Sequence, residues 1–249
     1  MANFSLFVAL SVLALMAGAR AMFPPPEQSS SPEALHFMTG IQKLCQNNSD
    51  SEDAFPTLMN SFQGTMMCAM MNVDMQSFMM DFNVLSNETR ATFFPRYCPQ
   101  LKRAGSCLDG PLNAAKPCLQ EYDFTLLKAM VGIYPDAVDL ICKNDGEIVF
   151  KLKEPKYKEC IDKLSENVME CAVPFVIQAQ HWEMSQLTRT QCGTITDLRQ
   201  CLARKLTVCE APDLINVYDL FHNTLFSVTP CRNYVSKVTE IEDNTVNEN

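Results

Sequence analysis

The sequence contains few of the residues from which catalytic and metal sites are usually built. It has three histidines, His36, His181 and His222, and none lies in a His-Glu-x-x-His motif, which argues against a zinc protease of that type. It has no Gly-x-Ser-x-Gly segment, the usual sign of a serine hydrolase. Only 8 of its 249 residues are glycine, and none of them forms a phosphate-binding motif. We therefore expect no catalytic residue, no metal site and no cofactor.

The chain also lacks an excess of basic residues. Its 29 acidic and 20 basic residues give a net charge of −9, so we expect neither a nucleic-acid-binding surface nor a polybasic membrane patch. The apolar run from Phe4 to Met16 is too short to span a bilayer and precedes Ala19-Arg20-Ala21, an A-x-A-like cleavage site. We predict that residues 1–21 are a signal peptide and that the mature chain is secreted, with no membrane span.

Cysteines, in contrast, are abundant. An even number of cysteines in an exported chain predicts a disulfide framework, and the absence of any Cys-x-x-Cys pair argues against zinc. Two four-cysteine runs have similar gaps, which are 9, 11 and 24 positions from Cys98 and 9, 8 and 22 positions from Cys192. This similarity predicts a duplicated unit. The twelve predicted disulfide cysteines are Cys45, Cys68, Cys98, Cys107, Cys118, Cys142, Cys160, Cys171, Cys192, Cys201, Cys209 and Cys231.

Helix geometry restricts how these cysteines can pair. A disulfide needs Cα atoms within about 7 Å, whereas nine residues of helix span about 13 Å. Cysteines that share a predicted helix, such as Cys160 and Cys171, therefore cannot bond to each other, and the bridges must run between helices. We favour a nested pattern in both runs, with the pairs Cys107–Cys118 inside Cys98–Cys142 and Cys201–Cys209 inside Cys192–Cys231.

The spacing of apolar residues predicts an all-α fold. A helix is expected to start near Pro32, and the segment from Thr57 to Phe82 is predicted as one long helix or as two with a break near Gly64. Residues 86–97 are rich in turn formers, and residues 147–152 are the only segment that suggests a strand. Two later segments have helical periodicity, Leu198, Cys201, Leu202, Leu206 and then Leu214, Val217, Tyr218, Phe221, Leu225.

These patterns divide the chain into four parts. The signal peptide is followed by a flexible Pro/Ser-rich leader at residues 22–33 and by a disulfide-stapled helical domain at residues 34–238. The similar cysteine runs suggest two pseudo-repeated helical halves in this domain. Residues 239–249 form an acidic tail with little apolar content, which we expect to be disordered. Two sequons, Asn47-Asn48-Ser49 and Asn87-Glu88-Thr89, predict glycosylation at Asn47 and Asn87.

Eight of the 15 methionines lie in the 22 residues from Met59 to Met80. We favour a helix that buries these side chains in the core, where methionine is an adaptable filler. An alternative is a plastic groove for an apolar ligand or partner, with Met66, Met70, Met71 and Phe78 as contacts. A third is a Cu(I) site, because thioethers are soft ligands. No histidine neighbours this stretch and Cys68 is expected to be bridged, so no metal site is predicted.

One segment carries a resemblance to a known family. The residues Ile141-Cys142-Lys143-Asn144-Asp145-Gly146-Glu147-Ile148 precede Glu159-Cys160 and Glu170-Cys171, and Asn144-Asp145-Gly146 predicts a turn with glycine in a left-handed conformation. With the signal peptide, the size and the twelve cysteines, this segment resembles the insect 27-kilodalton hemolymph glycoprotein family over about residues 41–235. The resemblance implies a circulating, glycosylated, mostly helical protein of insect hemolymph. It implies no established activity and no catalytic residues.

Together these observations predict a secreted, non-enzymatic glycoprotein of insect hemolymph. We expect it to bind a small hydrophobic ligand or an extracellular protein partner. The alternative is an extracellular immune or developmental interaction protein without a small-molecule ligand. The identity of the ligand or partner and the oligomeric state do not follow from the sequence.

Overall fold

The computed structural model describes residues 32–153, 164–208 and 214–234, and within these ranges every regular element is a helix. The predicted all-α fold is confirmed. The predicted signal peptide, most of the predicted leader, and the acidic tail at residues 239–249 lie outside the described residues. The described residues fall into two compact units, the first formed by residues 32–153 and the second by residues 164–208 and 214–234. The described cysteines of each four-cysteine run fall within one unit.

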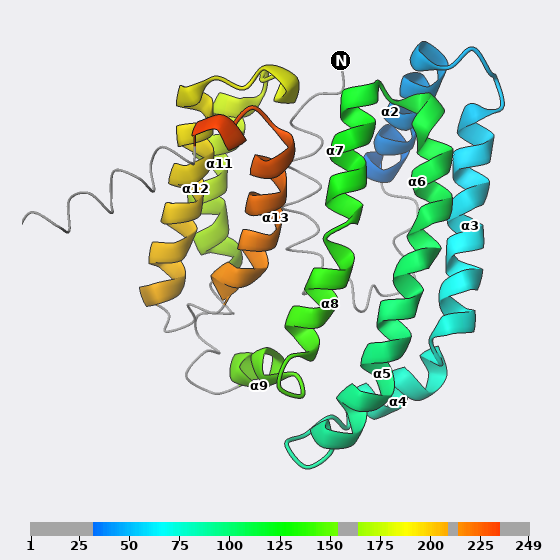
Figure 1. Ribbon diagram of the computed structural model, residues 1–249, viewed down its shortest axis with the longest axis vertical. Helices are drawn as coiled ribbons and strands as arrows, with labels where there is room; N and C mark the ends of the chain where they lie inside the picture. The colour runs from blue at the N-terminus through cyan, green and yellow to red at the C-terminus, as the bar shows by residue number, and fades with distance from the viewer. Residues whose placement is uncertain (1–31, 154–163, 209–213, 235–249) are drawn as a thin grey trace, which may run out of the picture. The chain divides into compact units, whose positions relative to one another are not determined.

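The first unit contains ten helical elements in its described part (Figure 1). Helix α3 packs against α6, α5 and the short helix η1, and Figure 1 shows it side by side with the green helices α5 and α6. Ala104, Gly105, Leu108 and Asp109 all have right-handed helical dihedral angles, so α5, η1 and α6 continue into one another. The elements are α2 (Pro32–Asn48), α3 (Ala54–Asn72), α4 (Met75–Asn83), α5 (Arg90–Ala104), η1 (Gly105–Leu108), α6 (Asp109–Ala115), η2 (Lys116–Cys118), α7 (Glu121–Val131), α8 (Tyr134–Cys142) and α9 (Glu147–Lys153).

The second unit is built from α11 (Leu164–Ala179), η3 (Met184–Gln186), α12 (Arg189–Val208) and α13 (Leu214–Val228). Helix α12 packs against both α11 and α13. The predicted periodicity holds, because Leu198, Leu202 and Leu206 on one side of α12 are all buried. Arg199 on α12 forms a bidentate ion pair with Asp219 on α13, at 2.6 Å for both N–O distances.

The break in the methionine-rich segment lies at Val73 and Asp74, not near Gly64. Gly64 remains inside α3, where glycine costs about 1 kcal/mol relative to alanine and does not by itself end a helix. Val73 is extended, with φ −122° and ψ 124°. The Asp74 carboxylate accepts a hydrogen bond from the Ser77 backbone N–H at 3.1 Å and caps α4. The helical segment is therefore interrupted where the Asp74 carboxylate can cap the start of α4.

Two further local predictions are wrong. Only residues 86–89 form a turn, and α5 begins at Arg90 and contains Pro95 and Pro99. The suggested strand at residues 147–152 is helix α9, in which Lys151 pairs with Glu147 one turn away at 3.0 Å. A short apolar run satisfies both a buried strand and a short helix, so periodicity could not distinguish them.

Among the residues that the structure describes, five disulfides join segments that are distant in the sequence. Their pairs are Cys45–Cys118, Cys68–Cys107, Cys98–Cys142, Cys171–Cys201 and Cys192–Cys231. The two outer pairs of the nested pattern, Cys98–Cys142 and Cys192–Cys231, are confirmed. The inner pairs Cys107–Cys118 and Cys201–Cys209 are wrong, because the structure links Cys107, Cys118 and Cys201 to other cysteines. Cys107 and Cys118 lie on one continuous helical segment, about 16 Å apart along it. Cys160 and Cys209 lie outside the described residues.

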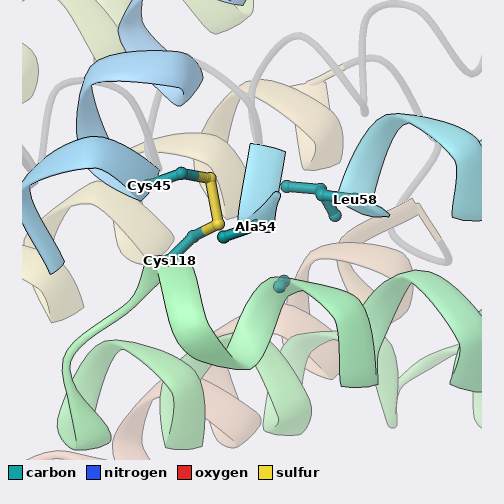
Figure 2. Close-up of a cluster of buried hydrophobic side chains, with 5 residues drawn as sticks. Cys45, Ala54, Leu58 and Cys118 are labelled. Carbon is teal, nitrogen blue, oxygen red and sulfur yellow. A yellow bond between two sulfur atoms is a disulfide. The ribbon is translucent and has the colours of Figure 1, made fainter. Parts of the chain in front are cut away.

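The Cys45–Cys118 bridge is the centre of one buried cluster. Figure 2 shows Ala54 and Leu58 of α3 beside the bridge, which joins α2 to η2. The Asn48 side-chain amide donates to the Cys118 carbonyl oxygen at 2.9 Å and closes the end of α2 over the bridge. This cluster fixes the first turns of α3 from one side.

A tight turn connects α8 to α9. Asn144, Asp145 and Gly146 have φ values of 51°, 53° and 72°, so the predicted left-handed glycine is observed and two further residues share its conformation. Arg90 of α5 holds this turn by donating to the carbonyl oxygens of Asn144 and Asp145, with a distance of 3.0 Å to the latter. The turn is thereby tied to the start of α5.

Candidate binding surface

The described histidines are not arranged with other metal ligands. No group of three His, Cys, Asp or Glu side chains within the described ranges could hold a metal ion. His181 is exposed, and its neighbour Trp182 packs edge-to-face on Phe175 at 5.8 Å, as a structural pair. His222 stacks on Phe226 at 4.2 Å. Burial lowers the pKa of His222, which favours the neutral ring.

The methionines of α3 lie mostly in solvent. Their exposed fractions are 63% for Met66, 66% for Met67, 61% for Met70 and 80% for Met71. Phe62 is 45% exposed on the preceding turn. The preferred interpretation from the sequence, a core helix filled by methionine, is therefore wrong for these positions. We call Phe62, Met66, Met67, Met70 and Met71 the methionine face of α3.

The opposite side of α3 explains why this face points outward. Leu58 is buried beside the Cys45–Cys118 bridge. Further along, Cys68 is bonded to Cys107, and the Thr65 hydroxyl donates to the Cys107 carbonyl oxygen at 3.2 Å. These contacts direct one side of the helix towards η1 and α6. At 3.6 residues per turn, Met66 and Met70 lie about 160° around the axis from Cys68, on the far side.

The sequence contains a signal that could have indicated this exposure. Residues 54–73 include no charged residue and no histidine, so charge does not mark a solvent-facing side. The apolar residues are instead spread around the helix over a wider arc than the single stripe with which an amphipathic helix usually faces the core. A helix that is apolar nearly all round can bury only the side that its neighbours reach, and the rest remains exposed.

The predicted ligand contacts divide into two groups. Met66, Met70 and Met71 lie together on the methionine face, whereas Phe78 lies on α4 in an aromatic cluster. Phe78 packs edge-on against Tyr97 at 5.1 Å and tilted against Phe93 at 5.5 Å. Phe78 is thus a core contact. The sequence-based set also missed Phe62 and Met67 of the face, and the exposed Met75 and Met80 of α4.

The second unit has an exposed apolar stripe in an equivalent place. Cys68 of α3 bonds to Cys107, the second cysteine of the first run, and Cys171 of α11 bonds to Cys201, the second cysteine of the other run. Met169 lies two residues before Cys171 and Val173 two residues after it, and both side chains are exposed. Ile177, one helical turn after Val173, is also exposed. The same relationship to the bridging cysteine thus produces an outward apolar stripe in both units.

Both predicted glycosylation sites are exposed. Asn87 lies in the turn between α4 and α5, where the Thr89 hydroxyl oxygen accepts from the Ser86 backbone N–H at 2.9 Å. Asn47 lies in the last turn of α2. Exposure is a requirement for a glycan at either position, and their occupancy stays a prediction.

Among the helices that the structure describes, none is both long and apolar enough to cross a membrane. The exposed side chains of Met66, Met67, Met70 and Met71 place the methionine face of α3 on the outside of a disulfide-linked helical unit. The methionine face, which lies on a single helix, is the candidate binding site of the chain.

Comparison with known proteins confirms the family resemblance. The chain is similar to the "27 kDa hemolymph glycoprotein" of Manduca sexta, with 23% identity over 150 residues, 58% of this chain and 63% of the relative. It is also similar to the "27 kDa hemolymph protein" of Galleria mellonella, with 24% identity over 140 residues, 55% of this chain and 59% of the relative. The matched part is thus about three-fifths of the length of these curated relatives. No solved structure matches the chain.

A family model described as "Protein of unknown function (DUF1397)" matches residues 31–231, which include every cysteine of the chain and all the helices described above. The chain belongs to this DUF1397 family.

Proposed function

We propose that this chain is a secreted, non-enzymatic glycoprotein of insect hemolymph that binds a protein partner through the methionine face of α3. The names of the two relatives and the disulfide framework support an extracellular location. The observation that carries the binding proposal is the exposure of five neighbouring apolar side chains on one helix. Contiguous exposed apolar patches on soluble proteins mark interaction sites.

The shape of the face favours a protein over a small ligand. Pockets for small molecules are concave and cover most of the ligand surface. The methionine face lies on one helix and can cover an apolar molecule from one side only. A partner that supplies the other side, such as a groove that accepts a helix, matches residues at i, i+4 and i+8, the spacing of Phe62, Met66 and Met70.

The charge distribution favours a protein over a lipid surface. Helices that lie in membrane interfaces are typically rich in lysine and arginine on their polar side. Residues 54–73 contain none, and the whole chain has a net charge of −9. We therefore expect no electrostatic attraction of this helix to anionic lipids, whereas flexible methionine side chains adapt well to a partner surface.

The test compares two charge variants with a matched control. Met70→Glu and Met71→Glu place a carboxylate on the face, and Gln76→Glu places the same charge on an exposed residue of α4. Each purified glycoprotein is labelled and mixed with insect hemolymph, and complex formation is measured by size-exclusion chromatography and crosslinking. We expect a complex for the native chain and for Gln76→Glu, and its loss for the two face variants.

Three other outcomes would overturn the proposal. Equal complex formation by all variants would place the contact elsewhere. A stoichiometric lipid in an organic extract of the native protein, identified by mass spectrometry, would favour a carrier of small apolar molecules. Binding of the native chain to neutral or anionic lipid vesicles that is lost in Met71→Glu would favour a membrane surface.

A further inference from the structure

Among the described residues, the four most exposed thioether groups lie together on α3. None of the ten cysteines that the structure describes is free, so they offer no thiolate to an oxidant. Methionine thioethers remain, and their susceptibility follows exposure. Met66, Met67, Met70 and Met71 are each more than 60% exposed, whereas Met184 of η3 is 8% exposed. A dissolved oxidant therefore meets the α3 thioethers before that of the buried Met184.

We propose that the methionine face is a modification site at which hydroperoxides form methionine sulfoxide, and that this modification switches partner binding off. In each step the thioether sulfur attacks the terminal peroxide oxygen and the O–O bond breaks. One oxygen atom is transferred to the sulfur, and the leaving oxygen takes up a proton to become water or an alcohol. The sulfur is oxidised by two electrons and the peroxide is reduced by two. The switch rests on the proposed function, whereas the modification itself does not.

The position of the face allows the switch to act without unfolding the chain. The sulfoxide group is polar and accepts hydrogen bonds, so an oxidised side chain is stable in water and unfavourable against an apolar partner. The contacts that hold α3 are made by other residues of the helix, namely Leu58, Thr65 and the bridged Cys68. Oxidation therefore changes the chemistry of the surface and leaves those contacts in place.

The equivalent stripe on α11 responds less. Its three exposed apolar residues are Met169, Val173 and Ile177, and only the first can form a sulfoxide. The two stripes therefore differ in the number of oxidisable side chains that they expose. The concentration of thioethers on α3 makes this helix the sensitive one of the pair.

The first experiment locates the modification. The full-length glycoprotein is treated with increasing amounts of hydrogen peroxide, quenched and analysed by peptide mass mapping. We expect one added oxygen at Met66, Met67, Met70 and Met71 before any appears at Met184, with an unchanged helical circular dichroism spectrum. Oxidation of Met184 at the same rate, or unfolding before the α3 methionines react, would overturn the proposal.

The second experiment tests the switch. A variant with Met66→Leu, Met67→Leu, Met70→Leu and Met71→Leu keeps the apolar face without sulfur, and its folding is checked by thermal melting. The readouts are ANS fluorescence, which reports exposed apolar surface, and complex formation in hemolymph. Peroxide should weaken both about tenfold or more in the native chain, the equivalent of losing the burial of one methionine side chain. It should leave the leucine variant unchanged.

The outcomes separate the two proposals. Sulfoxides on α3 with undiminished complex formation would overturn the switch alone. Absence of any complex before oxidation would overturn the proposed function, and the mapping and ANS measurements would still decide the modification. Recovery of binding after treatment with a thiol-dependent sulfoxide reductase would support a reversible switch, and no recovery despite removal of the added oxygen would contradict it.

Discussion

Gly146 lies directly against the ring of Phe94. A Cβ atom added at Gly146 would lie 1.8 Å from the Cζ atom of Phe94, and the glycine has a φ of 72°. Phe94 itself is buried in the aromatic cluster of α4 and α5. Both the backbone conformation and the space available therefore require glycine at this turn. The turn between α8 and α9 is packed against the core of its unit through this contact.

Gly146→Ala should be strongly destabilising. The added methyl group would displace the Phe94 ring and occupy an unfavourable left-handed conformation, so we expect a loss of about 3 kcal/mol or more in the free energy of unfolding. Urea unfolding followed by circular dichroism measures this change. Gly64→Ala is the matched control, because Gly64 lies inside α3 with open space around it and should gain about 0.5–1 kcal/mol. Equal effects at the two glycines would contradict this interpretation.

Truncation on the methionine face should have little effect on stability. Met70→Ala and Met71→Ala remove side chains that are mostly in water, so each should change the free energy of unfolding by less than about 1 kcal/mol. Leu58→Ala, on the buried side of the same helix, should cost about 2–5 kcal/mol. Chemical denaturation of the three variants tests the contrast. A cost of several kcal/mol at both methionines would indicate that another part of the protein covers the face.

All twelve cysteines should be bridged in the native protein. Denatured, unreduced protein should show no reaction with a thiol reagent. Equivalence of the two runs further predicts that Cys209 is linked to Cys160, as Cys118 is linked to Cys45. Non-reduced peptide mapping identifies the pairs, and two free thiols at Cys160 and Cys209 would contradict the equivalence. Loss of a native bridge such as Cys68–Cys107 should cost about 2–5 kcal/mol.

Stability should decrease in acid partly through His222. Burial lowers the pKa of His222 in the folded chain below its ordinary value of 6.5, so the unfolded chain binds the proton more tightly. This contribution to stability is complete above pH 6.5 and is lost progressively as the pH falls from 6.5 towards the lower pKa of the folded chain. His222→Phe keeps an aromatic ring beside Phe226, and its urea midpoint should fall less over the same range. Parallel pH profiles for the two proteins would refute the assignment.

Much of the architecture followed from residue patterns. Helical periodicity identified the buried side of α12, and the Asn144-Asp145-Gly146 segment identified a left-handed turn. The length of a helical segment showed that its own cysteines could not pair, and two of the proposed bridges, Cys98–Cys142 and Cys192–Cys231, were correct. The periodicity, the turn and the exclusion of pairs within one helix depend on local geometry, which a short stretch of sequence determines, whereas the two bridges join cysteines 44 and 39 positions apart.

The inner bridges and the methionine face were decided by tertiary structure. The partners of Cys107 and Cys118 depend on α3 and α2 packing beside the segment that carries these cysteines, and spacing along the chain does not encode that neighbourhood. The apolar residues of α3 likewise cover most of the helix, so their pattern does not distinguish the buried side from the exposed one. The Cys68–Cys107 bridge and the packing of Leu58 make that choice, because a helix held on one side must leave its other side to water.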